Sequence, residues 1–429
     1  MGYKPHVLAD SARFGMVVGF LCVFGGCGEP FRSAPTNTGG SAGSGGRREA
    51  AAGSAGSGMG GHQGLAGGGG RVAAGETGAG AEAGAGAEAG AGAEAGAGAE
   101  GGGGAAGLVG VFVAQGYEGR ITRSCDDGRT FPYDHSADDQ FRCFSDAEHN
   151  CDDSEVAGRG LAFGAGSFVA TWGYDHPGKL QRSTDGKEWT DVMTGTPPFE
   201  GVAYGNSVFV ADGNPTSVSA DGKTWSRGGK LSFDFDYRGI EFVPTAGGTF
   251  VVTGDSADER AISTSRDGKL WKAASKLPAE CVQDLCSIAG SDSVMLVASE
   301  QGHVCWSTDG DTWTYVAVTD HFTSRPLWTG TEFWIYSGAE LFKSAHAQSW
   351  TSVTIEPANI EIGAVARSPA GTLVAANAGW DVWYEDQRFF RSTDGVHWDV
   401  LPTTAFTGSH PINFITFGYV PPSADCGLR

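Results

Sequence analysis

Charged residues recur at one place in a series of short apolar segments of this chain, and their side chains suit the binding of anions. Arg159 and Glu200 each precede a small residue that is followed by apolar residues. Arg238 and Arg325 stand at the corresponding place in two later segments. A guanidinium group donates hydrogen bonds in a planar fork that matches carboxylate, sulfate and phosphate groups. If the fold brings these segments together, the three arginines form a candidate anion-binding site.

Two interpretations of these arginines remain open. In the first they bind a ligand, and Trp172, Tyr174 and Trp380 in nearby predicted loops add aromatic faces, which suit either a sugar ring or a protein surface. In the second, Glu200 and the aspartates between residues 234 and 236 neutralise the arginines internally. Cleavage of a glycan would additionally need two carboxyl groups that flank the bond. The sequence does not fix any such distance, so catalytic residues are not assigned.

A motif of the form Ser-x-Asp-Gly-x-x-Trp explains how such segments are positioned. Complete copies start at Ser183, Ser219, Ser265, Ser307 and Ser392. Residues 344–350 are a decayed copy, and residues 124–131 carry one inserted residue and Phe131 in place of Trp. Asp and Gly favour a tight turn, and Trp buries a large ring. Successive first serines lie 36 to 59 residues apart, which is the period of a propeller blade.

These motifs resemble the Asp-box, or bacterial neuraminidase repeat, over roughly residues 107–420. The resemblance implies a β-propeller of the sialidase-like superfamily with each motif on the turn between the third and fourth strands, away from the ligand face. Sialidases generally have six blades and an Arg-Ile-Pro segment, whereas the nearest string here is Arg120-Ile121-Thr122 on a predicted third strand. The sequence therefore favours a binding module for an anionic glycan or a protein, with a glycan-cleaving hydrolase or lyase as the alternative.

The ends of the repeat region predict how the ring closes. Residues 109–131 supply three strands without an innermost one, and residues 413–418 supply an innermost strand without followers. These two partial sets combine into one blade, which makes seven with the six complete blades. Pairing them closes the ring and leaves no exposed inner edge. We predict an all-β, seven-bladed β-propeller at residues 107–429, closed by pairing of residues 411–419 with residues 108–114.

The sequence before residue 107 predicts an export signal followed by a tether. Residues 1–26 combine basic residues with a short apolar run, which is typical of a signal peptide. Cys27 follows Phe24-Gly25-Gly26 and looks like the lipidated cysteine of a bacterial lipobox. Residues 27–106 are rich in Gly and Ala and lack the apolar residues of a core, so they predict a disordered tether. We expect an exported protein that is lipid-anchored in the cell envelope, with the outer membrane favoured and ordinary secretion as the alternative.

Charge narrows the classes of partner. The formal net charge is −21, from 29 basic and 50 acidic residues. Nucleic acid is therefore not expected, because phosphate neutralisation requires a basic surface. Acidic residues between Asp134 and Asp153 offer oxygen ligands for calcium, but their spacing matches no recognised site. No cofactor or metal site is assigned. We expect the protein to contact the membrane only through its lipid anchor, and to be a monomer.

Cysteine usage suits an oxidising compartment. We predict three disulfides: Cys143 with Cys151, Cys281 with Cys286, and Cys125 with Cys426. The first two join cysteines that are close in sequence, and the third joins the third strand of the split blade to the tail after its innermost strand. By exclusion, Cys305 is expected to be a buried free thiol.

Overall fold

The computed structural model describes eleven stretches of the chain within residues 107–426. Outside them lie the predicted signal peptide and tether, including Cys27, most of the acidic segment, and Cys143, Cys151, Tyr174 and Trp380. Within the described residues no helix is long and apolar enough to cross a bilayer. The described stretches are 107–117, 119–135, 158–173, 178–195, 199–231, 237–254, 261–282, 285–299, 301–377, 387–408 and 410–426.

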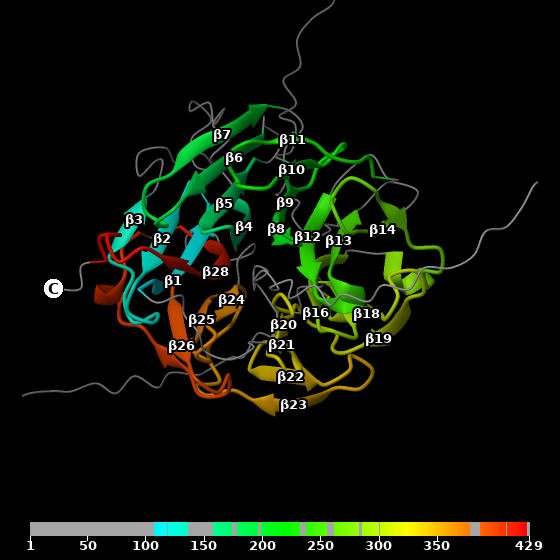
Figure 1. The fold of residues 1–429 in the computed structure, drawn as a ribbon. Helices are drawn as coiled ribbons and strands as arrows, with labels where there is room; N and C mark the ends of the chain where they lie inside the picture. Colours follow the sequence, from blue (N-terminus) through cyan, green and yellow to red (C-terminus); the bar gives the residue numbers. More distant parts are fainter. Residues whose placement is uncertain are drawn as a thin grey trace, which may run out of the picture. The chain divides into compact units, whose positions relative to one another are not determined.

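Seven four-stranded antiparallel sheets form a ring (Figure 1), which confirms the predicted seven-bladed propeller. In chain order, and from the innermost strand outward within each blade, the strands are as follows: blade 1, β28 (Ile412–Val420), β1 (Val109–Gly116), β2 (Ile121–Ser124) and β3 (Tyr133–His135); blade 2, β4 (Gly158–Gly164), β5 (Ser167–Trp172), β6 (Gly178–Ser183) and β7 (Thr190–Gly195); blade 3, β8 (Val202–Gly205), β9 (Val208–Ala211), β10 (Ser217–Ser219) and β11 (Ser226–Arg227); blade 4, β12 (Tyr237–Val243), β13 (Thr249–Gly254), β14 (Ala261–Ser265) and β15 (Lys272–Ala273).

The remaining strands are those of blade 5, β16 (Leu285–Gly290), β17 (Met295–Ser299), β18 (His303–Ser307) and β19 (Thr314–Ala317); blade 6, β20 (Leu327–Trp328), β21 (Phe333–Ser337), β22 (Glu340–Ser344) and β23 (Thr351–Thr354); and blade 7, β24 (Val365–Arg367), β25 (Leu373–Ala376), β26 (Phe389–Ser392) and β27 (Asp399–Val400). Three short 3-10 helices lie in the connections: η1 (Thr245–Gly247), η2 (Ala279–Val282) and η3 (Thr403–Ala405).

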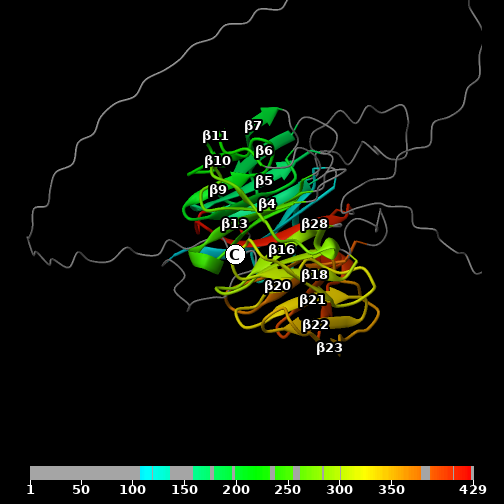
Figure 2. The ribbon, with the colours of Figure 1, turned by 90° about the vertical axis from the view of Figure 1, so that its right-hand side faces the viewer.

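Blade 1 closes the ring as predicted, because the C-terminal strand pairs with the N-terminal one. β28 runs antiparallel to β1 from the pair Val109↔Val420 to the pair Gln115↔Phe414. The two strands, red and cyan, lie side by side in Figure 1, and Figure 2 shows the ring from the side. A disulfide between Cys125 and Cys426 then joins β2's end to the tail, with Cα atoms 5.5 Å apart. The chain ends are therefore held by one ladder and one covalent bond.

The Ser-x-Asp-Gly-x-x-Trp motifs are the turns between third and fourth strands. In blade 2, the Ser183 hydroxyl donates to Asp185 Oδ1 at 2.9 Å and accepts from the Gly186 amide at 2.8 Å. Asp185 Oδ1 also accepts from the amides of Lys187 and Glu188. Gly186 has φ of 73°, a left-handed conformation that favours glycine. The same bonds recur in blades 4, 5 and 7, so the motif is a self-contained turn.

The hydrophobic core lies mostly between neighbouring blades. Phe209 of blade 3, for example, clusters with Leu180 and Val169 of blade 2. Trp313 of the blade 5 motif packs with Val251 and Ile262 of blade 4. Burying these side chains between sheets is what holds adjacent blades together.

The cysteine pairing in blade 5 differs from the prediction. Cys281 is bonded to Cys305, with Cα atoms 5.9 Å apart, and not to Cys286. Both bonded cysteines are buried in one hydrophobic cluster, because η2 packs against β18. Proximity in sequence misled the prediction, since packing of η2 brings Cys281 to a strand 24 residues later. Cys305 is therefore not a free thiol.

Candidate functional site

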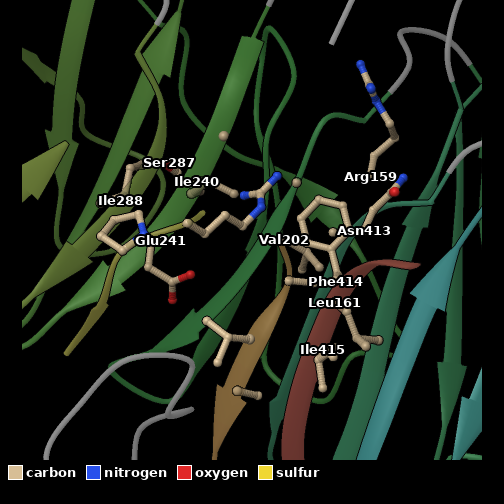
Figure 3. A pocket seen from close by; sticks show the side chains of 18 of the residues that line it. Arg159, Leu161, Val202, Ile240, Glu241, Ser287, Ile288, Asn413, Phe414 and Ile415 are labelled. Carbon is tan, nitrogen blue, oxygen red and sulfur yellow. The ribbon is translucent and has the colours of Figure 1, made fainter. Parts of the chain in front are cut away.

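A cavity lies at the centre of the ring, and residues from all seven innermost segments line it (Figure 3). It encloses about 830 Å³ of space not occupied by atoms, including solvent at its open end. The innermost strands begin at one end of the channel, and the turn motifs lie at the other end, where those strands finish. The fold and the cavity define a seven-bladed β-propeller with an axial pocket.

Ladder registers align the seven innermost segments residue by residue. We call four successive places the first to fourth positions, represented in blade 2 by Arg159, Gly160, Leu161 and Ala162. In order of blades 1 to 7, the first positions are Asn413, Arg159, Glu200, Arg238, Cys286, Ser324 and Gly363. The second positions are Phe414, Gly160, Gly201, Gly239, Ser287, Arg325 and Ala364.

The third positions are Ile415, Leu161, Val202, Ile240, Ile288, Pro326 and Val365, and all seven line the cavity. They form an apolar ring that we call the collar. The fourth positions are Thr416, Ala162, Ala203, Glu241, Ala289, Leu327 and Ala366.

A β-bulge sits at the first position of four blades. The ladder skips Asn413, Arg159, Arg238 and Cys286 in blades 1, 2, 4 and 5. A bulge leaves one residue unpaired and re-aims its side chain. Of these four residues, Arg159 and Asn413 line the cavity.

Arg159 and Glu200 form an ion pair between blades 2 and 3, and their side chains are 6% and 14% exposed. Behind them lies Asp212, which is fully buried and accepts hydrogen bonds from the amides of Glu200 and Gly201 at 2.7 and 2.9 Å. Burial, followed by the negative charge of Glu200, raises the pKa of Asp212 well above its usual range. Internal neutralisation, one of the two interpretations left open by the sequence, therefore describes Arg159.

Arg325 lies at the second position, one residue later than its sequence alignment with Arg159 implied. Its guanidinium carbon is 4.2 Å from the centre of the Phe414 ring, a cation–π contact between blades 6 and 1. The other five second positions carry Gly, Ser or Ala. A small residue is needed there because innermost strands approach closely: a Cβ on Gly160 would lie 2.8 Å from the Gly201 Cα.

Glu241 is a cavity-lining carboxyl group that the sequence reasoning did not single out. It is partly buried at the fourth position of blade 4, and in Figure 3 it lies across the cavity from Phe414. Its Oε1 accepts a hydrogen bond from the Phe242 amide at 3.2 Å. Burial raises the pKa of Glu241 to about 8, although this hydrogen bond and the positive charge of Arg325 act in the opposite direction. The signal that could have revealed it is a carboxylate where the other blades carry Ala, Leu or Thr.

The remaining predicted residues are not brought to the cavity. Trp172 is 1% exposed and packs in the core cluster between blades 1 and 2, which contradicts its expected ligand-facing role. At the end of β5 its ring points into the blade interface, since side chains alternate along a strand. Arg238 has its backbone on β12 beside the lining residue Gly239, but its side chain lies outside the part that the structure describes. Among the described residues no group of His, Cys, Asp and Glu could hold a metal ion.

No protein-family model and no curated protein matches the chain. Among solved structures, YCF48 bound to D1 peptide is similar over 73% of this chain and 91% of its own, with 14% identity and a TM-score of 0.46. A functionally unknown protein from Desulfotomaculum acetoxidans matches over 73% of this chain and 100% of its own, with 10% identity and a TM-score of 0.49. Selenomethionine-substituted virginiamycin B lyase from Staphylococcus aureus matches over 62% and 96%, with 11% identity and a TM-score of 0.46. Likeness at this level carries no argument about function.

Proposed function

We propose that this protein is a tethered Asp-box propeller that binds an anionic ligand, on a glycan or a protein, at the open end of its central cavity. The observation that carries the proposal is the place of Arg325. A guanidinium group lines the cavity at a position where five of the seven blades carry Gly, Ser or Ala. Small-molecule sites combine apolar walls with a few placed polar groups, as the lining of this cavity does.

The cavity supports binding better than glycan cleavage. Hydrolysis needs two carboxyl groups that flank one bond, one to protonate the leaving group and one to attack or activate water. Glu200 is held by Arg159, and Asp212 is fully buried behind them. Glu241 then remains as the carboxyl group at the cavity wall among the described lining residues. A binding role uses this arrangement as it stands.

The proposed cellular place follows from the N-terminal sequence. Residues 1–26 would be removed as an export signal, Cys27 would carry lipid, and residues 27–106 would tether the propeller to the cell envelope, with the outer membrane favoured. The net charge of −21 supports solubility and speaks against nucleic acid as partner.

Isothermal titration of uronate-containing oligosaccharides and of acidic peptides into the wild-type protein tests this proposal. Arg325→Ala should weaken binding of the active class about tenfold or more, because a hydrogen bond to a charged group contributes about 1.5–3 kcal/mol. Arg129→Ala is the matched control, since Arg129 is exposed on a turn motif. Absence of heat with every anionic glycan and peptide, and with small carboxylates as well, would remove the proposal.

A further inference from the structure

We infer that the cavity is a site for a small carboxylic acid with an apolar body, such as a branched or medium-chain aliphatic acid. Its carboxylate lies between the Arg325 guanidinium and the Glu241 carboxyl group, and its body packs against the collar. This inference rests on the proposed binding of an anion in the same cavity, and it replaces the glycan or protein of that proposal with a small free acid.

Three cavity-lining residues depart from the pattern that the seven blades share. Whatever the ring needs for packing is needed seven times, so a residue that breaks the pattern in one blade has a local reason. At the second position the large side chains are Arg325 and Phe414, and at the fourth position the ionisable one is Glu241. All three line the same cavity, from blades 6, 1 and 4. Three independent exceptions therefore meet in one place.

Contacts among these residues suit one carboxylate. The guanidinium carbon of Arg325 lies 4.2 Å from the centre of the Phe414 ring, and a planar guanidinium fork binds a carboxylate with two hydrogen bonds. Burial keeps Glu241 protonated at neutral pH, since its pKa is raised to about 8. A neutral carboxyl group donates an O–H hydrogen bond, which the second lone pair of the ligand's carboxylate accepts.

The collar decides what is attached to that carboxylate. Leu161, Val202, Ile240, Ile288 and Ile415 are each at least nine-tenths buried and offer aliphatic surface to the cavity. A sugar placed there would leave hydroxyl groups without partners, at a cost of about 1–3 kcal/mol each. Arg325 covers one face of the Phe414 ring, which is therefore not open to a sugar. An apolar body gains from the same surface.

Protonation of Glu241 sets the pH dependence of binding. The charged groups that line the cavity with it are Arg325, Arg367, and the Arg159–Glu200 pair, with Asp212 behind that pair. As the pH rises through about 8, Glu241 becomes negative, loses its donor proton and repels the ligand. Affinity for an acid that stays ionised throughout should therefore fall on the alkaline side.

Isothermal titration of hexanoate into the full-length protein, at about pH 6.5 and about pH 9.5, is the decisive experiment. We expect hexanoate to bind at the lower pH, and hexanamide and glucuronate to bind at least about tenfold more weakly. Arg325→Ala should weaken hexanoate binding about tenfold or more, while Arg325→Lys keeps the charge but loses the fork. Glu241→Gln should bind at the lower pH and lose the alkaline decline, because its amide donates at both pH values.

Each alternative result has a defined meaning. Glucuronate binding more tightly than hexanoate, with the same dependence on Arg325, would overturn the aliphatic acid and leave the proposed function standing. Hexanoate binding that is equal in wild type and Arg325→Ala would also overturn the inference. If no carboxylate, anionic oligosaccharide or acidic peptide gives heat of binding, the proposed function fails as well. Melting curves of each variant show whether it is folded.

Discussion

Single residues in the cavity differ in how their charge is compensated. Glu241 lies in a place where six blades do without a charge, and burial there raises its pKa to about 8. Arg159 and Glu200 compensate each other, whereas Glu241 has a single hydrogen bond, from the Phe242 amide, among the bonds that the described residues show. A group whose burial costs stability is a candidate for a functional site.

Glu241→Gln should stabilise the protein at neutral pH. Between the unfolded pKa near about 4.3 and the folded pKa of about 8, the folded state binds more protons than the unfolded state, so wild-type stability falls as pH rises. Removing this ionisable group should raise the free energy of unfolding by about 1–3 kcal/mol near pH 7 and by nothing near pH 4. Urea unfolding at the two pH values measures the difference. Glu280→Gln, at an exposed glutamate on η2, is the control and should show no such divergence.

At the scale of the element, the turn motif is the unit that makes a blade. Its Asp accepts hydrogen bonds from the amides two and three residues later, and its Ser accepts one from the Gly amide, so the hairpin is satisfied within itself. In blade 6 the decayed copy has Ala347 at φ of 61°, yet the turn is kept and Trp350 donates to the Ala347 carbonyl oxygen. The backbone geometry therefore survives loss of the Asp, because the blade packs around it.

Acid should weaken several turns together. Although burial acts in the other direction, amide hydrogen bonds lower the pKa of Asp267, and amide bonds lower that of Asp221 to about 2. A lowered folded pKa gives stability that is present above the unfolded value near about 3.9 and is lost as pH falls through the folded value. The melting temperature should drop steeply between about pH 4 and about pH 2. Asp267→Asn should shrink this drop, measured by circular dichroism, whereas a change at the exposed Asp292 should leave it intact.

At the scale of the whole molecule, closure of the ring joins residues that are far apart in sequence. The β1–β28 ladder and the Cys125–Cys426 disulfide both bring the last residues of the chain to the first strands of the propeller. A closed ring of packed blades has no free inner edge, so its stability depends on the seam in blade 1.

Loss of the Cys125–Cys426 bond should destabilise the propeller more than loss of the Cys281–Cys305 bond. The loops span 301 and 24 residues, and the chain-entropy model gives about 6 and about 3 kcal/mol. Serine variants of each pair, compared by thermal melting, measure the order. Non-reducing peptide mapping that recovers Cys125 and Cys426 as free thiols would contradict the seam disulfide.

Lipidation of Cys27 predicts where the molecule resides. Cys27→Ser should shift the protein from the membrane fraction to the soluble fraction, because the proposed anchor is removed. Cys22→Ser, within the apolar run of the signal, should leave the membrane fraction unchanged. Continued membrane association of Cys27→Ser would instead indicate an uncleaved N-terminal anchor.

The sequence by itself determined what local chemistry controls. The turn motifs, the count of seven blades, the pairing of β1 with β28 and the Cys125–Cys426 bond all follow from residues whose role repeats or whose strand inventory must balance. Arg159, Glu200 and Arg325 were also found in advance, because each introduces an innermost strand, and all three line the cavity.

Only the tertiary structure decided what depends on contacts between blades. The ladder register of blade 6 places Arg325 at the second position, where it contacts Phe414. No local sequence pattern encodes this contact. Packing of η2 on β18 chose Cys305 over Cys286 for Cys281, and strand alternation turned Trp172 into the core. The burial that raises the pKa of Glu241 likewise depends on how the blades pack. Spacing along the chain fixes turns and strands, whereas charge pairing and burial are set by residues that approach from other blades.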